Sequence, residues 1–502
     1  MSTERPDREH LKRDYVFHEM TRSVCPECLR TIDAKVLIRD GKVFLNKWCP
    51  DHGTTEALVS TDAAYYVEAS KYNKPGRVVD HHAVAKEKGC PWDCGICADH
   101  EQHTCVGIID ITDACDLRCP TCFAASGGRS FLSLEQIGSM LDAFIRQEGD
   151  PTVLQISGGE PTEHPDILEI LRMATGKGIP WVMLNTNGLR LARDPEFADR
   201  LAELKDKLEV YLQFDSLKPE ATETLRGVDC LDLKMKAIAN CAARGIPMHL
   251  SCTVKKGVND AELGELVRFG IKTPFVRGIN FQPAFWSGRF DHPVDPLERT
   301  TLTDVLAGLE DQTKGMFRKT DFVPLPCSHP TCIAMTYAWI KGNGRVKPIP
   351  RFIDMDRHLK NFTNTIFMNP MKVYEEALAN IFSLSAVMSS AKTLHDFGCI
   401  CGNPFRKAFF SKEGRRELHD HKLFRILVIQ FEDRYTFDLK RVKKCCIGHI
   451  LPDGRIIPFC SYNTLYRPTC DVSHWVGTDG AEARAAGAAG LEAVPGPAES
   501  AS

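Results

Sequence analysis

The stretch DACDLRCPTCFA, residues Asp113–Ala124, carries three cysteines in a C-x3-C-x2-C pattern: Cys115, Cys119 and Cys122. Three thiolates can hold three irons of a [4Fe–4S] cluster, whereas clusters held by protein alone normally use four cysteines. The missing ligand leaves one iron open to a small molecule, as the open position does in a catalytic zinc site. The alternative is a structural metal knuckle that takes its fourth ligand from elsewhere in the chain.

The sequence around these cysteines alternates between short β-forming runs and amphipathic stretches such as Leu134–Gln147 and Ile167–Thr175. The expected strands are Val106–Thr112, Thr152–Ser157, Trp181–Asn187, Leu208–Asp215, Met248–Val254 and Val276–Pro283. Strands that alternate with helices predict an α/β fold with a parallel sheet, and six units fit a partial (βα)6 barrel. In such barrels the chemistry lies in the loops after the strands.

The loop after the second expected strand reads ISGGEP and contains Gly158, Gly159 and Glu160. Glycines allow a close approach of the backbone, and a carboxylate suits an ammonium group. Together with the cysteine triplet, this loop resembles the radical S-adenosylmethionine (SAM) superfamily over the whole middle region. The resemblance implies that the cluster cleaves SAM reductively, and that the 5′-deoxyadenosyl radical abstracts hydrogen from an unactivated C–H bond.

The resemblance also implies how SAM is bound. The ISGGEP loop receives the amino group of SAM, and NTNG (Asn185–Gly188) and QFDS (Gln213–Ser216) face its ribose and carboxylate. Asp215 is the expected ligand of a ribose hydroxyl; the alternative is that it caps a helix. SCTV (Ser251–Val254) and GINFQP (Gly278–Pro283) line the adenine side.

The N-terminal region contains a C-x2-C-x20-C-x2-H arrangement. Two knuckles of this kind are typical of a ribbon that holds one tetrahedral zinc or iron ion, and the sequence does not choose between the metals. The alternative is that the histidine is a turn residue and another group completes the site. The expected ligands are Cys25, Cys28, Cys49 and His52.

The segment before the first barrel strand provides four thiols within a short stretch. They suffice for a complete auxiliary [4Fe–4S] cluster next to the catalytic one. The alternative is a second zinc knuckle that uses His100 or His103. The expected ligands are Cys90, Cys94, Cys97 and Cys105.

The last third of the chain contains a second possible auxiliary cluster, since CCIGHILPDGRIIPFC resembles the segment that follows many radical SAM barrels. Its expected ligands are Cys327, Cys332, Cys446 and Cys460, with Cys399, Cys401, Cys445 and Cys470 as competitors. Three further cysteines lie inside expected elements, where cysteine behaves as a small buried hydrophobe. They are Cys230, Cys241 and Cys252.

The order of these parts resembles one subgroup, which contains archaeal tetraether lipid synthases and radical SAM methylases of 7,8-dihydro-6-hydroxymethylpterin. We expect the lipid reaction, a C–C bond between two alkyl chains, with the apolar section Ala377–Ala391 after Phe362–Met368 as a channel wall. Ordinary helix packing is the alternative, and residue by residue it explains that section better. The alternatives are methylation of a pterin or other small substrate, and a non-catalytic iron–sulfur electron carrier.

The 502 residues have a formal charge of −3, which excludes the basic excess of a nucleic-acid binder. We expect a cytoplasmic protein, at most peripheral to a membrane, that acts on a small molecule or lipid and takes electrons from ferredoxin or flavodoxin. The expected divisions are a metal ribbon (1–85), an auxiliary-cluster segment (86–105), the barrel (106–325), a Cys-bearing region (326–475) and a disordered tail (476–502).

Overall fold

The computed structural model describes residues 13–477 except 78, 80, 291, 293, 294, 342–343 and 352–421. Its N-terminal part is a four-stranded antiparallel sheet whose strands pair in chain order. The strands are β1 (Val16–Val24), β2 (Thr31–Arg39), β3 (Lys42–Cys49) and β4 (Gly53–Ser60), and α1 (Ala63–Ala69) and η2 (Ser70–Tyr72) follow. This sheet buries a small apolar cluster of its own that includes Val36 and Leu45.

A larger sheet of twelve strands contains the expected barrel. Six parallel strands lie side by side in chain order: β5 (Val106–Asp110), β6 (Val153–Ser157), β7 (Trp181–Thr186), β8 (Leu208–Gln213), β9 (Met248–Val254) and β10 (Val276–Pro283). The helices along this part of the chain are α2 (Leu134–Glu148), α3 (Ile167–Gly176), α4 (Leu189–Arg193), α5 (Pro195–Ala202), α6 (Pro219–Arg226), α7 (Leu231–Ala243), α8 (Leu263–Lys272) and α9 (Leu302–Gln312). The α/β class and the partial (βα)6 barrel are thereby confirmed.

Strands from the end of the chain extend this sheet at both edges. β14 (Leu423–Ile429) pairs in parallel with β10, and β15 (Ile447–Ile450) pairs in parallel with β5. The remaining strands are β11 (Val323–Pro324), β12 (Ile333–Ile340), β13 (Val346–Pro348) and β16 (Ile456–Pro458). The sheet therefore continues across the expected boundary at residue 325, since β12, β13, β14, β15 and β16 belong to it as well.

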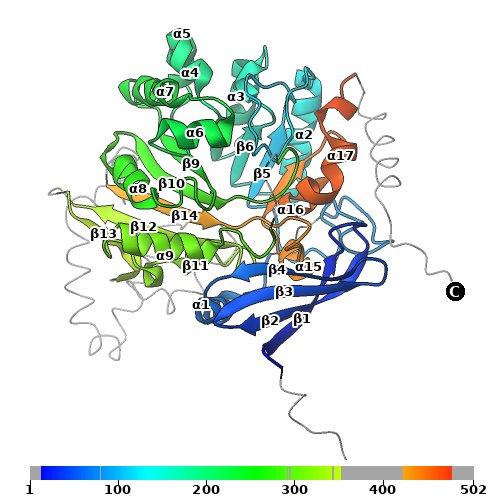
Figure 1. Cartoon of the computed structure of the whole chain (residues 1–502). Helices are drawn as coiled ribbons and strands as arrows, with labels where there is room; N and C mark the ends of the chain where they lie inside the picture. Colours follow the sequence, from blue (N-terminus) through cyan, green and yellow to red (C-terminus); the bar gives the residue numbers. More distant parts are fainter. Residues whose placement is uncertain are drawn as a thin grey trace, which may run out of the picture.

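Short helices complete the described chain. They are η3 (Pro161–Glu163), η4 (Lys319–Asp321), η5 (Ile349–Arg351), α15 (Leu439–Lys443), α16 (Phe459–Ser461), η7 (Tyr462–Tyr466), α17 (Arg467–Cys470) and η8 (Val472–His474). In Figure 1 the blue N-terminal sheet lies below the large sheet, next to the orange segment with α15 and α16. In the described part of the chain, we find no helix with the length and apolar character needed to cross a bilayer.

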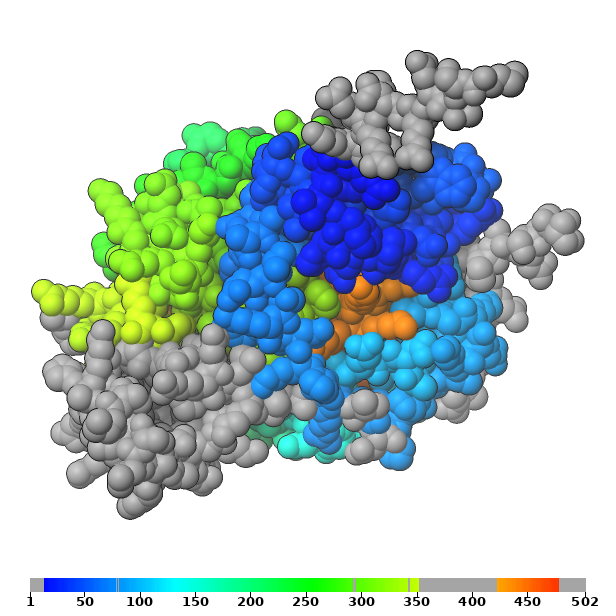
Figure 2. Space-filling model, turned by 90° about the horizontal axis from the view of Figure 1, so that it is seen from below, coloured from blue at the N-terminus to red at the C-terminus, as the bar shows by residue number. Residues whose placement is uncertain are grey.

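The two sheets are joined through the segment between β14 and α15. Ser23 Oγ donates to the Phe437 carbonyl at 2.5 Å, and Lys47 Nζ donates to the Arg434 carbonyl at 2.7 Å. Figure 2, seen from below, shows the dark blue N-terminal strands beside the orange C-terminal segment. The N-terminal sheet is thus packed directly on the part of the chain that carries the late cysteines.

Candidate active site and metal centres

The cysteine triplet lies in the loop after β5, at the carboxyl end of the parallel strands. Cys115, Cys119 and Cys122 belong to one apolar cluster, and Cys230, at the start of α7, packs in it as well. A tight turn brings the last two together, because the Cys122 amide donates to the Cys119 carbonyl at 3.3 Å. The three cysteines therefore contact the same apolar cluster, and three thiols in one loop suit a cluster with an open iron.

The thiol of Cys115 lies in surroundings that disfavour a free thiolate. Burial, reinforced by the nearby Glu160 carboxylate, raises the pKa of Cys115 to about 12. A thiolate at this position therefore needs a positive partner, and metal ions provide one by binding the deprotonated form. The donor set fits an iron–sulfur cluster, whose irons are bound by thiolates.

The two glycines after β6 let that loop touch the backbone of the cysteine loop. A Cβ on Gly158 would lie 2.3 Å from the Thr112 carbonyl oxygen, and one on Gly159 would lie 2.1 Å from that of Ala114. The Gly159 amide donates to Thr112 and the Glu160 amide donates to Ala114, both at 2.7 Å. Any side chain at either glycine would push the two loops apart.

The Glu160 carboxylate is buried and bridges the ends of β6 and β7. Its Oε1 accepts from the Thr162 amide and hydroxyl and from Thr186 Oγ1, at 2.6 to 3.0 Å. Its Oε2 accepts only from the Asn187 amide, at 2.7 Å. A carboxylate oxygen with one donor can accept another, so Glu160 fits a cationic amino group at Oε2.

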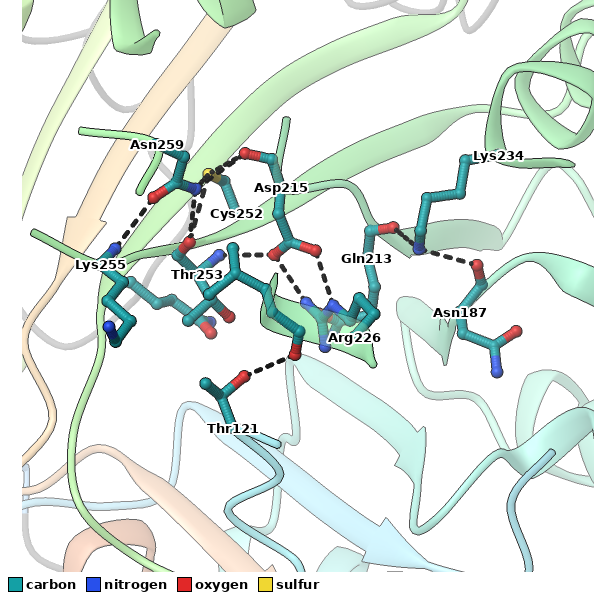
Figure 3. Close-up of polar contacts among 12 residues, drawn as sticks. Thr121, Asn187, Gln213, Asp215, Arg226, Lys234, Cys252, Thr253, Lys255 and Asn259 are labelled. Carbon is teal, nitrogen blue, oxygen red and sulfur yellow. Dashed lines mark hydrogen bonds and ion pairs between the residues drawn. The ribbon is translucent and has the colours of Figure 1, made fainter. Parts of the chain in front are cut away.

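Two other expected SAM ligands, Asn185 and Asp215, have polar side-chain partners, and Figure 3 shows those of Asp215. Asn185 Nδ2 donates to Ser157 Oγ at 3.0 Å, and its Oδ1 accepts from Gln213. Asp215 forms a two-pronged ion pair with Arg226, with both contacts at 2.6 Å, and also accepts from the Thr253 amide. Its role toward a ribose stays a prediction.

The alternative that Asp215 caps a helix is wrong, because Lys218 occupies the N-cap of α6. The carboxylate of Asp215 binds the guanidinium of Arg226 and not the first amides of a helix. Although burial acts in the opposite direction, this ion pair holds the pKa of Asp215 below its ordinary value. The carboxylate is therefore charged and fixed at the carboxyl end of β8.

Lys234, which our sequence analysis passed over, lies at the same end of the barrel. Its ammonium is buried and donates to the carbonyls of Gln213, at 2.6 Å, and Asn187, at 3.2 Å (Figure 3). Burial lowers its pKa, and the nearby Arg226 adds to that effect. The signal was present in the sequence, because Lys234 shares the buried face of α7 with Ala237, Ile238 and Cys241.

The four expected ribbon ligands come together, and we call them the ribbon site: Cys25, Cys28, Cys49 and His52. His52 Nδ1 lies 3.6 Å from Cys25 Sγ and 3.5 Å from Cys49 Sγ. Although burial opposes it, hydrogen bonds from His52 and the backbone lower the pKa of Cys49 to about 7. The ring faces two thiols as a ligand would, and the set fits one tetrahedral ion.

The set expected from Cys90 to Cys105 divides in the structure. Cys105 lies with Cys327 and Cys446, and the three sulfurs are within 4.8 Å of one another. The strand register explains this, because Ile447 of β15 pairs with Val106 of β5 and the preceding residues are therefore neighbours. We call these three cysteines the β5–β15 thiol set.

The β5–β15 thiol set has the spacing of ligands on one metal. Cys327 Sγ and Cys446 Sγ are 3.7 Å apart, which suits thiolates bound to one ion at about 2.3 Å. His103 Nε2 lies 3.6 Å from Cys105 Sγ, and its Nδ1 contacts Glu148 at 2.9 Å. Carboxylates often orient metal-binding histidines in this way. His100 points elsewhere, toward the Cys445 carbonyl at 2.9 Å.

The remaining late cysteines form a different group from the one we expected. Burial raises the pKa of Cys445 to about 12, and the neighbouring Cys332 contributes to this shift. The pKa of Cys460 is also raised by burial, with contributions from Glu432 and Cys445. Arg441 Nε donates to Cys332 Sγ at 3.2 Å. We call Cys332, Cys445 and Cys460 the C-terminal thiol set. The structure divides the expected set of four, because Cys327 and Cys446 lie with Cys105.

The other three cysteines of the segment before β5, which are Cys90, Cys94 and Cys97, lie close together. The pKa of Cys90 is raised mainly by burial, and the neighbouring Cys94 and Cys97 add to this effect. Cys470, by contrast, lies beside Arg455, whose Nη2 donates to its sulfur at 3.7 Å. Cys241 and Cys252 are buried in the main core, as expected. Cys399, Cys401, the apolar sections Phe362–Met368 and Ala377–Ala391, and the tail from 478 lie outside the described residues.

Comparison with known proteins identifies two regions of the chain. Residues 109–270 match the radical SAM superfamily, and residues 17–61 match the HMPTM N-terminal zinc ribbon domain. The chain is 36% identical over 484 residues to 7,8-dihydro-6-hydroxymethylpterin dimethyltransferase of Methanocaldococcus jannaschii, which covers 90% of this chain and 94% of that protein.

Other similarities are restricted to part of the chain. The mycofactocin maturase MftC of Mycobacterium tuberculosis is 35% identical over 158 residues, or 31% of this chain and 39% of that protein. The crystal structure of Streptococcus suis SuiB superposes with a TM-score of 0.35 at 20% identity, and covers 42% of this chain and 46% of that one.

Proposed function

Because this chain belongs to the radical SAM superfamily, in the subgroup of 7,8-dihydro-6-hydroxymethylpterin dimethyltransferase, we propose that it methylates a reduced pterin. The observation that carries the proposal is the 36% identity that extends over 94% of the pterin enzyme. A similarity of that extent includes the ribbon, the barrel and the C-terminal strands. The substrate is then a small planar heterocycle.

The lipid-coupling reaction that we expected from the sequence finds no support in these comparisons. The relative that matches nearly end to end is named for a pterin, and the apolar sections offered as a lipid channel lie outside the described residues. The electron-carrier alternative also falls, because the chain is a radical SAM enzyme. Methylation, which was our second hypothesis, becomes the first.

The chemistry starts in the loop after β5. Cys115, Cys119 and Cys122 would hold a [4Fe–4S] cluster, which would supply the electron for the reductive cleavage of SAM. Glu160 Oε2, which accepts from the Asn187 amide, would also accept from the amino group of SAM. The buried charges of Asp215, Arg226 and Lys234 fix the ends of β7 and β8 around it.

The proposed reaction balances with two molecules of SAM and two electrons for each methyl group. One SAM yields 5′-deoxyadenosine, which carries away the hydrogen of the substrate C–H bond, and methionine. The other SAM donates its methyl group to that carbon and leaves as S-adenosylhomocysteine. The two electrons come from a reductant such as ferredoxin or flavodoxin, and we propose a cytoplasmic location and no nucleic-acid partner.

We propose further that the other thiols bind metal. The ribbon site holds one zinc or iron ion, and the β5–β15 thiol set holds a second centre. The C-terminal thiol set and the set Cys90, Cys94 and Cys97 are the candidates for one or two auxiliary [4Fe–4S] clusters. Iron, zinc and sulfide analysis of anaerobically purified protein tests the count, and about four irons in total would leave only the catalytic cluster.

The decisive experiment supplies the reconstituted enzyme with dithionite, methyl-labelled SAM and 7,8-dihydro-6-hydroxymethylpterin. We expect labelled methyl groups on the pterin ring, with 5′-deoxyadenosine and S-adenosylhomocysteine formed alongside. The matched control is Cys115→Ala, which should form no product. Abundant 5′-deoxyadenosine with an unchanged pterin would refute the substrate while leaving SAM cleavage intact.

A further inference from the structure

The interior of the barrel contains a cavity with two unlike walls. The space inside it that the centres of water-sized molecules can occupy is about 100 Å³. One wall is apolar and comes from β5, β14, β15 and α16: Val106, Ile108, Leu427, Ile429, Ile447 and Phe459. The other wall is polar and comes from β7 to β10: Asn185, Tyr211, Gln213, His249, Asn280 and Gln282.

The polar wall is organised around one phenol. Tyr211 Oη accepts from Gln282 Nε2 at 3.0 Å and from Asn280 Nδ2. The ring of Tyr211 stacks on that of His249, with centroids 5.8 Å apart and planes at 12°. These contacts fix both amides, so the side-chain oxygen of Asn280 has a defined position in the cavity wall.

Two buried polar atoms of residues around the cavity, one on the polar wall and one on β14, have no hydrogen-bond partner within the described structure. They are the acceptor Asn280 Oδ1 and the donor Arg425 Nε. Both residues line the cavity, and they stand on the neighbouring strands β10 and β14, where Gly278 pairs with Arg425 and Asn280 with Leu427. Leaving a buried polar group unpaired destabilises the protein, so this cavity favours a ligand that provides a donor for Asn280 and an acceptor for Arg425.

Gly278 makes room for this arrangement. A Cβ at this position would lie 2.3 Å from the Arg425 carbonyl oxygen and 2.6 Å from His249 Cε1. Arg425 Nη2 in turn approaches His249 Nδ1 at 3.3 Å. Because Gly278 has no side chain, His249 can lie against β10 and β14. His249 in turn contacts the guanidinium of Arg425 beside the cavity.

We propose that Asn280 and Arg425 bind the pyrimidinone edge of the pterin, with Asn280 Oδ1 accepting from ring N3–H and Arg425 Nε donating to the C4 carbonyl. This inference rests on the proposed function and adds to it the residues that select the substrate. The apolar wall contacts the faces of the planar ring. An alkyl chain would leave both polar atoms unpaired, so the cavity disfavours lipid chains.

The test compares two pteridines whose edges carry opposite hydrogen-bond patterns. 6-Hydroxymethylpterin offers N3–H and a C4 carbonyl, whereas 2,4-diamino-6-hydroxymethylpteridine offers an N3 acceptor and a C4 amine. Binding to the SAM-loaded holoenzyme is followed by the fluorescence of each compound. We expect the wild type to prefer the pterin at least about tenfold, since the reversed edge loses both hydrogen bonds.

Variants then show which residues cause the preference for the pterin over the diaminopteridine. Asn280→Leu should abolish it, while Asn280→Asp, which keeps an acceptor oxygen, should retain most of it. Asn240→Leu removes an amide that binds the Leu191 carbonyl outside the cavity and serves as the matched control.

The possible results distinguish a failure of the Asn280 and Arg425 assignment from a failure of the proposed methylation. Equal binding of both compounds by the wild type, or a preference that survives in a folded Asn280→Leu protein, overturns the inference and leaves methylation intact. If Asn280→Leu does not fold, the wild-type preference and Arg425→Met decide in its place. A wild type that binds neither compound and methylates no pterin overturns the proposed function as well.

Discussion

The ribbon site and the β5–β15 thiol set are both compact groups of metal-type ligands, but the chain assembles them differently. The ribbon ligands lie on two knuckles of one small sheet, and Cys25 and His52 are 27 residues apart. In the other set, Cys327 and Cys446 alone are 119 residues apart. The first depends on local turns, whereas the second depends on the pairing of β15 with β5.

The difference shows which part of a metal site is visible in a sequence. Spacing fixes geometry only while the ligands share a turn or a hairpin, as in the ribbon. Cys105 follows Cys97 closely along the chain, yet its sulfur lies with cysteines from two remote segments. A strand that begins at Val106 carries it away from its sequence neighbours and toward β15.

The largest effect should follow loss of the ribbon metal. Cys49→Ala removes one ligand of a site on which a small sheet depends, and structural zinc contributes on the order of 10 kcal/mol in isolated fingers. We expect one equivalent of metal to be lost and the ribbon to become sensitive to protease. Unchanged metal content and thermal unfolding would show that the four ligands bind nothing.

The β5–β15 thiol set should lose its metal as a unit. Cys105→Ala, Cys327→Ala and Cys446→Ala should each remove the same metal equivalents, whereas Cys90→Ala should leave them in place. Cys241→Ala, which changes a buried cysteine away from these sets, is the matched control. If Cys90→Ala and Cys105→Ala lost the same metal, Cys105 would belong with Cys90, Cys94 and Cys97, as the sequence predicted.

Glu160 belongs to the predicted SAM site. The residues of that site are farther apart in the sequence than the ribbon ligands and closer than those of the β5–β15 thiol set. Glu160→Gln keeps the shape of the side chain but removes its charge, so SAM binding should weaken by about 1.5–3 kcal/mol. Equilibrium dialysis with labelled SAM measures this change. Glu262→Gln is the control, because its buried carboxylate binds Ser216 and the Leu217 amide. Equal losses in both variants would indicate a general disturbance of the barrel.

The smallest effect concerns the joint between the two regions. Ser23→Ala removes the hydrogen bond to the Phe437 carbonyl, and we expect a loss of about 1 kcal/mol in the free energy of unfolding. Lys71→Ala removes an exposed ion pair with Glu68 and a contact with the Tyr72 ring, and it should change stability by less. Denaturant titration compares the two variants, and equal values would mean that the Ser23 hydrogen bond adds nothing to stability.

Much of the barrel could be predicted because its strands are buried on both faces and appear as short apolar runs. The run Thr152–Ser157, for example, corresponds to β6 at Val153–Ser157. The edge strands could not be placed, because nothing in Leu423–Ile429 or Ile447–Ile450 indicates which edge of the sheet each one joins. That choice is made by packing over the whole sheet.

The same limit applies within the candidate site. The loops with the cysteine triplet and ISGGEP were visible because each lies in a short motif. The partner of Asp215 was not, because Arg226 approaches it from the far end of α6. Lys234 could have been found, since a lysine on an apolar helix face calls for buried acceptors.

The pairing of both sheet edges with the last strands of the chain has a consequence for biosynthesis. While the ribosome is still adding residues after β10, β5 and β10 are open edges that could pair with other chains. They are closed only when β14 and β15 emerge. With the metal content proposed above, the ribbon ligands would be complete early in synthesis, whereas Cys105 would have to wait for Cys446. The two proposed sites would then take up metal at different times.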